Sequence, residues 1–598
     1  MRVNPDFVLF SYSFPQQINI LLFNRYDHLD QNEFKNSKTN SYTKSQLIRS
    51  ESENEKYSLF LHGKVFYRKE YSHDSTGSIS EQDLLYQLVM NGESFLKKLK
   101  GEFLIFLYDS QNKSVKLYTD QLHAYTYYYY FSDSLLIISS SFSEIISILR
   151  DNNIQLKINN HALIEYYLFD YILNNETFIE NIYETGPGEI IELKKNKISI
   201  DKHYDVFKDL NFSGPDTDQI AGIEILKDVF NHNVNISIQR PETIAVALTG
   251  GYDSRSLIAS LGNNFKEYQY YSYGKPESWD IMIPQLIADK IGLNYKPFLL
   301  GSEFEEQFTE LGEKALMLSD GTGRLTNANY VYIYSSFFPG KSSIMTGLFG
   351  SELIKRISGP NLAMNSKVLA LLTSKDLEKT VISQLKDTWQ DNFFSQEFIN
   401  PLAEAVISKV LAHELVNNRL PQNQKVFLHF LRLGIPKYFQ KELKIQSPWV
   451  SNLHPFFDLD FINALMKTPF PNVYSWNLKK SLVKNLKTHK LYGALIDQKP
   501  VLSEFISTHG FKPKYLRHKI YTPLLAMDFY RYKKKIKADS SMTFNDLNQK
   551  ALQNKISQFV PEPDSPFYSM IQKADQNNPE FLKMYSLYYW LKAHGIES

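Results

Sequence analysis

The chain has 598 residues, of which 43% are apolar, so it is long enough for more than one domain with a buried core. Lys and Arg number 66 against 65 Asp and Glu, so no overall charge attracts nucleic acid or an anionic membrane. The absence of cysteine excludes disulfides, zinc–thiolate sites, iron–sulfur clusters and a cysteine nucleophile. Because neither a signal-peptide core nor a membrane-length apolar run is present, we expect a cytoplasmic protein.

The first third of the chain predicts a β-sandwich. Short apolar and aromatic runs recur there with polar turns between them, as is typical of layered sheets. The run 57–67 is interrupted at His62-Gly63-Lys64, which predicts a hairpin. Further predicted strands are 101–108, 114–119, 125–131 and 134–140, and the predicted helices are 81–91 and 161–168. Consecutive tyrosines at 127–130 should point to opposite faces of a strand.

The pattern changes after a loop-like stretch near 205–218. A helical period at 218–238 is followed by the continuous apolar run 243–248, which is typical of a buried parallel strand. Helix and strand then alternate, with helices at 255–261 and 281–291 and strands at 268–273 and 343–346. This alternation predicts a doubly wound parallel sheet, and the periods after about 376 predict helical additions.

The sequence Thr-Gly-Gly-Tyr-Asp-Ser at 249–254 stands directly after the apolar run and before a helix. Two glycines let backbone N–H groups close on an oxyanion, and a helix N-terminus favours negative charge. Asp253 would repel a bare phosphate, so its position indicates a magnesium ion between them. No Gly-Lys-Ser/Thr follows, which excludes a Walker loop. The segment predicts a pyrophosphate cradle, whereas a capped Gly-Gly turn is the plainer alternative.

These residues are similar to the Ser-Gly-Gly-x-Asp-Ser loop of the ATP pyrophosphatase superfamily, with Thr249 in place of the first Ser. From about 57 to 499 the chain resembles the asparagine synthetase family, which includes β-lactam synthetase and the lasso-peptide macrolactam synthetases. Segments 101–109, 120–129 and 161–188 resemble the family's N-terminal-nucleophile (Ntn) glutaminase. Because Arg2 stands at the nucleophile position and no cysteine exists, the resemblance implies that glutamine hydrolysis is lost.

The fold that this resemblance implies is α/β. A degenerate Ntn-type β-sandwich at 1–208 would precede a parallel-sheet ATP pyrophosphatase domain at 209–510 with helical additions, and a helical extension would occupy 511–598.

The resemblance also implies a site for ATP and Mg²⁺. The expected nucleotide contacts are Leu248, Thr249, Gly250, Gly251, Tyr252, Asp253, Ser254, Tyr273, Thr346 and Gly347. Asp253, which is also expected to be catalytic, would hold the metal together with Glu352, since Ser351 stands where the family usually has a second aspartate. Lys499 aligns with the Lys of the family's Arg-x-Lys pair and is expected to stabilise the adenylate and the tetrahedral intermediate. A surface lysine is the plainer alternative for this residue.

The function implied is that of an ATP-dependent, AMP-forming amide ligase without its own glutaminase. Its partners would be a small-molecule or peptide carboxylate and an amine, either free ammonia or one carried by the substrate. The second source favours macrolactam or other natural-product amide formation over asparagine biosynthesis. An ammonia-dependent asparagine synthetase-like or sugar-amidating ligase remains an alternative, as does a nucleotide-binding protein without turnover. No nucleic acid or membrane partner is expected, and a homodimer is left open.

Overall fold

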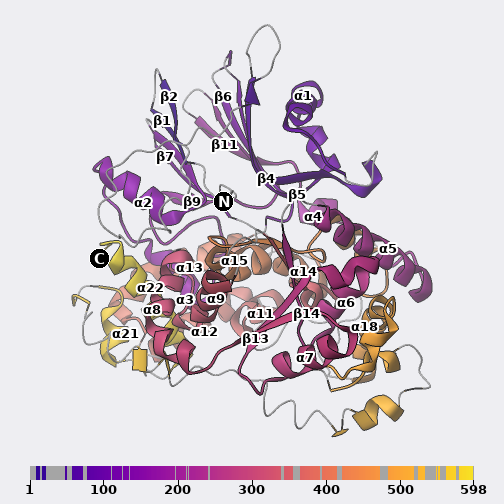
Figure 1. Ribbon diagram of the computed structural model, residues 1–598. Helices are drawn as coiled ribbons and strands as arrows, with labels where there is room; N and C mark the ends of the chain where they lie inside the picture. Colours follow the sequence, from indigo (N-terminus) through magenta and orange to yellow (C-terminus); the bar gives the residue numbers. More distant parts are fainter. Residues whose placement is uncertain are drawn as a thin grey trace.

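The computed structural model describes most of the chain from residue 57 to residue 596. The described ranges are 9–13, 17–21, 48–49, 57–71, 77–337, 343–354, 364–413, 420–471, 482–531, 547–551, 561–573 and 578–596, with short gaps inside several of them. The protein is mixed α/β, which confirms the predicted fold class. An N-terminal pair of antiparallel sheets lies against a C-terminal parallel sheet surrounded by helices (Figure 1).

The N-terminal part contains two antiparallel sheets. The first has the order β2-β1-β8-β7-β9 and the second the order β11-β10-β6-β5-β4-β3. The strands of the first are β1 Leu9–Ser13, β2 Gln17–Leu21, β7 Tyr128–Ser132, β8 Leu135–Ser139 and β9 Ile182–Glu184. Those of the second are β3 Ile48–Arg49, β4 Tyr57–Tyr67, β5 Leu99–Asp109, β6 Ser114–Thr119, β10 Glu189–Lys194 and β11 Lys197–Lys202.

The two sheets form the predicted sandwich, covered by helices on both outer faces. Phe106 of the second sheet and Tyr129 and Ile138 of the first belong to the apolar cluster between them. Helix α1 (Glu81–Asn91) covers the second sheet, while α2 (Phe142–Asp151) and α3 (Asn160–Phe169) cover the first. Tyr128 lies in the outer cluster, on the opposite face from Tyr129, as the alternation of a strand requires.

The hairpin predicted at 57–67 is wrong. Strand β4 is continuous there and pairs with β5 along its whole length, from Tyr57 opposite Asp109 to Tyr67 opposite Leu99. Gly63 has φ +92°, and a Cβ on it would lie 2.1 Å from the carbonyl oxygen of Glu102. The glycine therefore permits a close approach of two strands and does not form a turn.

The C-terminal part is built on a five-stranded sheet in which every neighbouring pair is parallel, with the order β14-β13-β12-β15-β16. Its strands are β12 Ile244–Ala247, β13 Gln269–Gly274, β14 Asn294–Leu299, β15 Ser343–Met345 and β16 Ser451–Leu453. Helix α5 Gln219–Ile238 precedes the first of these strands, and the helices between them include α6 Tyr252–Ser260, α7 Trp279–Ile291, α8 Ser302–Leu318, α9 Ala328–Phe337 and α10 Gly350–Ile354. The predicted alternation of strand and helix is confirmed.

The remainder is mainly helical, as predicted. It contains α11 Ser366–Thr373, α12 Leu377–Gln390, α13 Gln396–Ala412, α14 Gln422–His429, the π-helical segment η6 Phe430–Phe439, α15 Gln440–Gln446, α16 Leu459–Met466, α18 Leu482–Ile496, α21 Tyr568–Lys573 and α22 Pro579–Ala593. Within the described residues, none of the helices has both the length and the apolar character that crossing a membrane requires.

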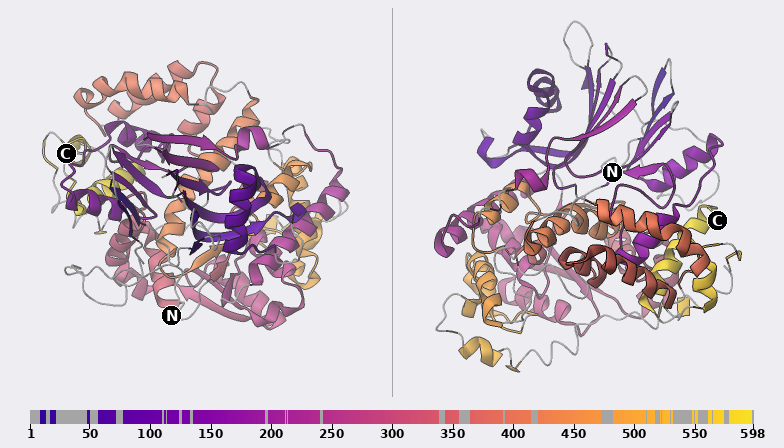
Figure 2. Two further views of the ribbon diagram at one scale, coloured as in Figure 1. Left: turned by 90° about the horizontal axis from the view of Figure 1, so that it is seen from above. Right: turned by 180° about the vertical axis from the view of Figure 1, so that it is seen from behind.

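Helix α22 joins the two parts of the chain near the C-terminus (Figure 2). The ring of Trp590 stacks on Phe142 with 5.3 Å between ring centroids, and His594 Nε2 lies 2.9 Å from Ser143 Oγ on α2. One apolar cluster accordingly extends from the first sheet through the C-terminal part. The boundaries at 208 and 510 stay predictions.

Candidate functional site

The loop 249–254 lies at the carboxyl end of β12, the middle strand of the parallel sheet. Helix α6 begins at Tyr252 with Gly251 as its N-cap, so the predicted strand, loop and helix follow one another as expected. Leu248 is fully buried, and its N–H donates to the carbonyl oxygen of Tyr271 on β13 at 2.8 Å. Because all the strands are parallel, the exits of β13 and β15 flank this loop, which is where α/β proteins bind ligands.

Side-chain oxygens hold the backbone of the loop in place. The N–H of Thr249 donates to Ser254 Oγ at 3.0 Å, and the N–H of Gly251 donates to Thr249 Oγ1 at 3.2 Å. The N–H of Gly250 donates to Asp280 Oδ1 at 3.2 Å. Burial raises the pKa of Asp280, although the hydrogen bond from Gly250 opposes the shift. Each of these amides thus donates to a side-chain oxygen. A bound phosphate would have to replace that side-chain oxygen with one of its own.

Asp253 lies at the centre of the predicted site. Its Oδ2 accepts a hydrogen bond from Ser351 Oγ at 2.7 Å, and its Oδ1 accepts one from the hydroxyl of Tyr492 on α18. The segment after β15 lies directly on this residue, since a Cβ on Gly347 would come within 2.6 Å of Asp253 Cβ. The structure therefore brings together Asp253, Gly347 and Ser351.

The second expected metal ligand, Glu352, lies close to the same phenol. Burial, followed by the charge of Asp253, raises the pKa of Tyr492 well above its usual value, and the charge of Glu352 contributes. In the described part of the chain, no group of three His, Asp or Glu residues is arranged to hold a metal. Asp253 in the first turn of α6 and Glu352 in the first turn of α10 nevertheless provide carboxylates of the kind that Mg²⁺ takes, since this ion uses few protein ligands and completes its shell with phosphate oxygens and water.

Two further predicted contacts lie at the exits of the neighbouring strands. Tyr273 is near the end of β13, where its ring meets that of Tyr330 edge-on with 6.3 Å between centroids. Thr346 follows β15, and its Oγ1 lies 3.3 Å from His454 Nδ1. Gly251 leaves space on its side of the loop, because a Cβ there would meet only Thr249 Oγ1, at 3.3 Å.

Lys499 is not brought to the loop. Its Nζ donates to the carbonyl oxygen of Gly262 at 2.6 Å and lies 4.2 Å from the centroid of the Phe265 ring. Both partners follow the C-terminal end of α6, whereas the loop precedes its N-terminal end. The length of this nine-residue helix, about 13 Å, separates Lys499 from the predicted phosphate position.

The sequence did not reveal the residues that connect the backbone of the loop to segment 505–508. Arg255 is completely buried and donates to three carbonyl oxygens, those of Phe505 at 2.8 Å, Ile506 at 2.5 Å and Gly250 at 3.3 Å. The N–H of Thr508 also donates to the carbonyl oxygen of Gly250, at 3.0 Å. Segment 505–508 therefore lies on the loop. An arginine in the first turn of a helix gives no local signal of such contacts.

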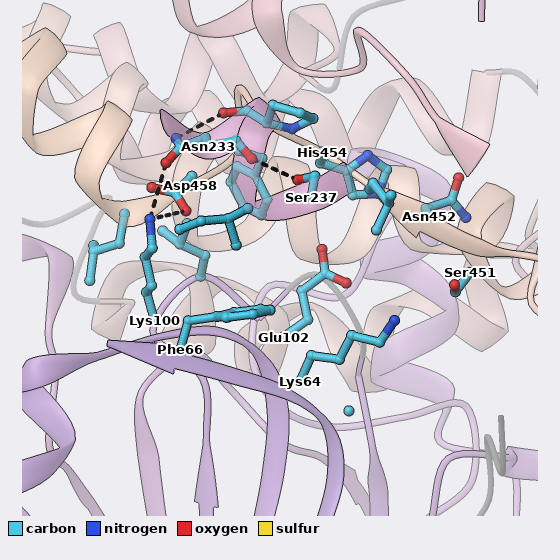
Figure 3. A pocket seen from close by; sticks show the side chains of 18 of the residues that line it. Lys64, Phe66, Lys100, Glu102, Asn233, Ser237, Ser451, Asn452, His454 and Asp458 are labelled. Atoms are coloured by element: carbon cyan, nitrogen blue, oxygen red, sulfur yellow. Dashed lines mark hydrogen bonds and ion pairs between the residues drawn. The ribbon is translucent and has the colours of Figure 1, made fainter. Parts of the chain in front are cut away.

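A cavity of about 280 Å³ lies between the N-terminal sheets and the parallel sheet. In Figure 3, Lys64 and Glu102 extend from β4 and β5 toward the segment that carries Asn452 and His454. The Nδ2 of Asn452 is buried and has no hydrogen-bond partner among the described residues. Because His454 also contacts Thr346, this cavity adjoins the exit of β15.

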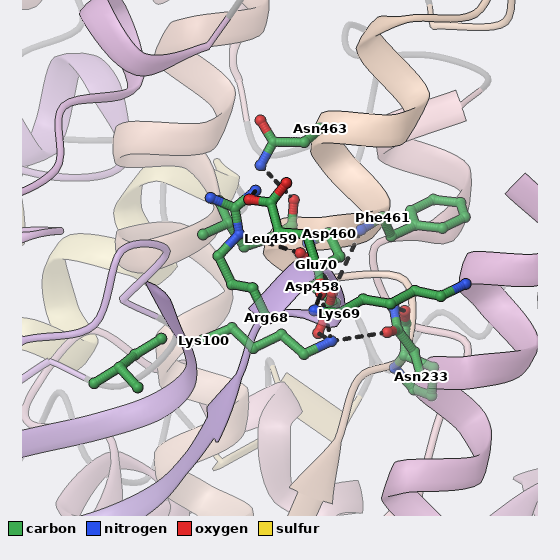
Figure 4. A network of polar contacts seen from close by, with 12 residues as sticks. Arg68, Lys69, Glu70, Lys100, Asn233, Asp458, Leu459, Asp460, Phe461 and Asn463 are labelled. Carbon is green, nitrogen blue, oxygen red and sulfur yellow. Dashed lines mark hydrogen bonds and ion pairs between the residues drawn. The ribbon is translucent and has the colours of Figure 1, made fainter. Parts of the chain in front are cut away.

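A buried ionic network closes one wall of this cavity (Figure 4). The Nζ of Lys100, on β5, lies 3.0 Å from Asp458 Oδ2, 2.9 Å from Asp460 Oδ2 and 3.0 Å from Asn233 Oδ1. Lys100 is only 3% exposed. Burial lowers its pKa, but the two carboxylates reverse the effect and raise it overall. This network fixes the N-terminal sheets against α5 and the start of α16.

Comparisons with known proteins bear on the N-terminal part. Residues 49–204 match the glutamine amidotransferase domain family. Among solved structures, the chain is similar to the allosteric regulatory enzyme of purine biosynthesis, with 10% identity over 49% of this chain and 59% of that one, at a TM-score of 0.20. It is also similar to glutamine phosphoribosylpyrophosphate amidotransferase from B. subtilis with ADP and GMP, with 10% identity over 49% and 60% of the chains, at a TM-score of 0.18. The matches thus span less than two thirds of those chains. No curated protein matches.

The first part of this chain is therefore similar to a glutamine amidotransferase domain. The matched residues include the strands from β4 to β11 and the residues of β4 and β5 that line the cavity of about 280 Å³. Since the chain has no cysteine, this domain has no cysteine nucleophile.

Proposed function

We propose that this chain is an asparagine synthetase-like, ATP-dependent amide ligase that forms AMP and has no glutaminase activity of its own. The observation that carries the proposal is the loop 249–254, which lies at the carboxyl end of β12 with Asp253 beside the exit of β15. The amidotransferase-type domain in the same chain supports amide chemistry. Without a cysteine to release ammonia from glutamine, the amine is free ammonia or is carried by the substrate.

The proposed reaction has two steps. An oxygen of the substrate carboxylate attacks the α-phosphorus of ATP, and pyrophosphate leaves; the amine then attacks the acyl-adenylate, and AMP leaves. The amides of Gly250 and Gly251 and the hydroxyl of Ser254 would bind the departing pyrophosphate at the start of α6. Mg²⁺ held by Asp253 and Glu352 would offset the phosphate charge. We assign no step to Lys499.

Several substrate classes fit this chemistry. A small-molecule or peptide carboxylate with an amine in the same molecule would give a macrolactam or a related natural product. Free ammonia would give asparagine or an amidated sugar. The carboxylate substrate is best identified by offering a panel of carboxylates, some with an amine in the same molecule and others together with free ammonia.

Pyrophosphate release from Mg²⁺–ATP in the presence of that panel tests the proposal. We expect release with at least one carboxylate, and its loss in Asp253→Ala because the metal and the phosphates lose their common partner. Asp289→Ala on the exposed end of α7 is the matched control and should retain full activity. Unchanged release in Asp253→Ala would remove the mechanism.

A second candidate is a nucleotide-binding protein without turnover. The observation that favours it is the hydrogen bond of 2.7 Å between Ser351 Oγ and Asp253 Oδ2, where a hydroxyl stands in place of a second carboxylate. Calorimetric titration separates the two candidates. ATP affinity without pyrophosphate release across the panel supports the binding protein, and release supports the ligase.

A further inference from the structure

Helix α15 begins beside the exits of the two strands that flank the loop 249–254. It packs against α9, which carries Tyr330 (Figure 1). The ring of Tyr330 meets that of Tyr273, near the end of β13, with 6.3 Å between centroids. Just before α15, the ring of Phe439 meets that of Phe349, which follows β15, with 5.2 Å between centroids. The start of α15 therefore lies at the edge of the sheet where the ligase proposal places the nucleotide.

Two residues of opposite charge, Lys441 and Glu442, follow one another in the first turn of α15. Glu442 interacts with the hydroxyl of Tyr330, because burial and then the charge of this carboxylate raise the pKa of Tyr330 well above its usual value. Burial also raises the pKa of Glu442, while Lys441 and Tyr330 act in the opposite direction. Glu442 is thus directed toward α9 and the exit of β13.

The ammonium of Lys441 has no oxygen partner in the part of the chain that the structure describes. Its Nζ lies 4.2 Å from the centroid of the Tyr438 ring and makes neither a hydrogen bond nor an ion pair with the described residues. Burial lowers the pKa of Lys441 to about 8, and the positive charge of Arg324 adds to this effect, while Glu442 opposes it. The residue is nevertheless partly exposed, so a ligand can reach it.

Neighbouring lysines differ from Lys441 in this respect. Lys444, one turn further along α15, contacts the carboxylate of Asp320, and Lys437 Nζ lies 2.9 Å from Glu184 Oε2. An ammonium that is largely removed from water without an oxygen acceptor costs free energy, and lysines perturbed in this way are typical of functional sites. An oxygen of a bound ligand would provide the missing acceptor for Lys441.

The nearest guanidinium makes an anionic ligand favourable. Arg324 Nη2 lies 3.8 Å from Asp170 Oδ1, an oxygen that also accepts a hydrogen bond from Lys583 Nζ at 2.8 Å. The charges of Arg324 and Lys441 repel each other. A negative group beside Lys441 would offset this repulsion as well as satisfy the ammonium.

We propose that Lys441 binds the carboxylate group of the ligase's substrate, at the edge of the sheet where the exits of β13 and β15 flank the loop 249–254. This inference rests on the proposed function, which requires a carboxylate beside the nucleotide. Lys441 acts on the carboxylate substrate, whereas the loop and the metal act on the phosphates. Glu442 is directed toward Tyr330, so the ammonium is the charge of this pair that remains available to the substrate.

Steady-state pyrophosphate release with the panel of carboxylates tests the inference. In Lys441→Gln we expect KM for the carboxylate to rise about tenfold or more, while KM for ATP changes by less than about twofold. Lys441→Arg keeps the positive charge and should restore most of the lost affinity, which a merely structural role would not predict. Lys290→Gln on the exposed end of α7 is the matched control. Release with an unchanged KM for the carboxylate in Lys441→Gln, or with an equal rise in both KM values, would overturn the inference and leave the ligase proposal standing.

Chemical labelling decides the matter if no carboxylate supports release. The unaltered full chain is acetylated with sulfo-N-hydroxysuccinimide acetate, with and without each carboxylate of the panel, among them succinate and L-aspartate. Mass spectrometry then compares Lys441 with Lys290. At least one carboxylate at a saturating concentration should slow acetylation of Lys441 by about fivefold or more and leave Lys290 unaffected. Protection of Lys441 without pyrophosphate release would retain the carboxylate site while the ligase proposal fails. Acetylation of Lys441 that no carboxylate slows, or an equal slowing at Lys290, would overturn the inference whatever the release assay shows.

Discussion

Arg255 holds the predicted phosphate loop against segment 505–508, and its removal should loosen that contact. Arg255→Met keeps the length of the side chain but removes every donor. The carbonyl oxygens of Phe505 and Ile506 then lose their hydrogen bonds from the guanidinium, of 2.8 and 2.5 Å, whereas that of Gly250 keeps the N–H of Thr508.

The magnitude follows from these contacts. A hydrogen bond to a charged group contributes about 1.5–3 kcal/mol, so two of them give about 3–6 kcal/mol. Part of this is offset, because burial of the guanidinium is itself costly and lowers the pKa of Arg255 to about 10. We therefore expect the local opening of segment 505–508 to become easier by about 3 kcal/mol, which corresponds to roughly a hundredfold.

Hydrogen exchange measured by mass spectrometry reads this directly. The N–H groups of Ser507 and Thr508, which donate to Phe511 at 3.2 Å and to Gly250 at 3.0 Å, should exchange about a hundredfold faster in Arg255→Met. Arg255→Lys should lie between, since one ammonium cannot reach all three carbonyls. Peptides from β5 serve as the internal control. Unchanged exchange at 505–508 would refute the idea that Arg255 fastens the loop.

Four further predictions address the network, the metal and the lysine. Lys100→Met should destabilise the protein by about 3 kcal/mol in thermal melts, because the partly buried Asp458 and the buried Asp460 lose the ammonium that they share, while Asp460 keeps Arg68 at 3.2 Å. Lys116→Met, which removes a partly exposed ion pair with Glu93, should have little effect; equal melting temperatures would contradict this. Burial raises the pKa of Asp460, but Lys100 and its other partners lower it overall, so its contribution is present above about pH 4 and is lost as the pH falls below it. The acid-induced fall in melting temperature should therefore be smaller in Lys100→Met, and parallel curves would exclude the explanation. Ser351→Asp should tighten Mg²⁺-dependent ATP binding about tenfold in calorimetric titrations, with no change expected in the absence of Mg²⁺; a loss of affinity would show that the carboxylate repels the phosphates. Lys499→Ala should leave pyrophosphate release unchanged because its ammonium is bound to Gly262, and a loss of about a hundredfold would restore its catalytic role.

The parts of the fold that were predictable from sequence carry local signals. The apolar run 243–248 and the glycine pair after it identified β12 and the start of α6. Consecutive apolar residues indicate a buried strand, and consecutive glycines indicate a flexible turn. Alternating faces at Tyr128 and Tyr129 followed from strand geometry. The hairpin predicted at Gly63 was wrong because the glycine permits a close approach to the carbonyl of Glu102 on the neighbouring strand and does not form a turn.

The supports of the candidate site could not be predicted in this way, because each joins distant segments. Tyr492 reaches Asp253 across 239 residues, and Arg255 reaches Ile506 across 251. Neither contact changes the periodicity of the helix that carries it. A pattern within a short stretch of sequence therefore cannot predict either contact.

The position of Lys499 shows how a short motif and a fold can disagree. After α18 the chain approaches the loop at 505–508, where Thr508 Cγ2 would lie 2.6 Å from a Cβ on Gly250, and at Phe511, whose carbonyl oxygen accepts a hydrogen bond from Tyr252. Sequence similarity therefore selected a lysine a few positions before the segment that the tertiary structure places on the glycine pair. Chemistry that needs a side chain close to the phosphates has to be sought among residues of that later segment, or in a rearrangement that moves α18 along α6.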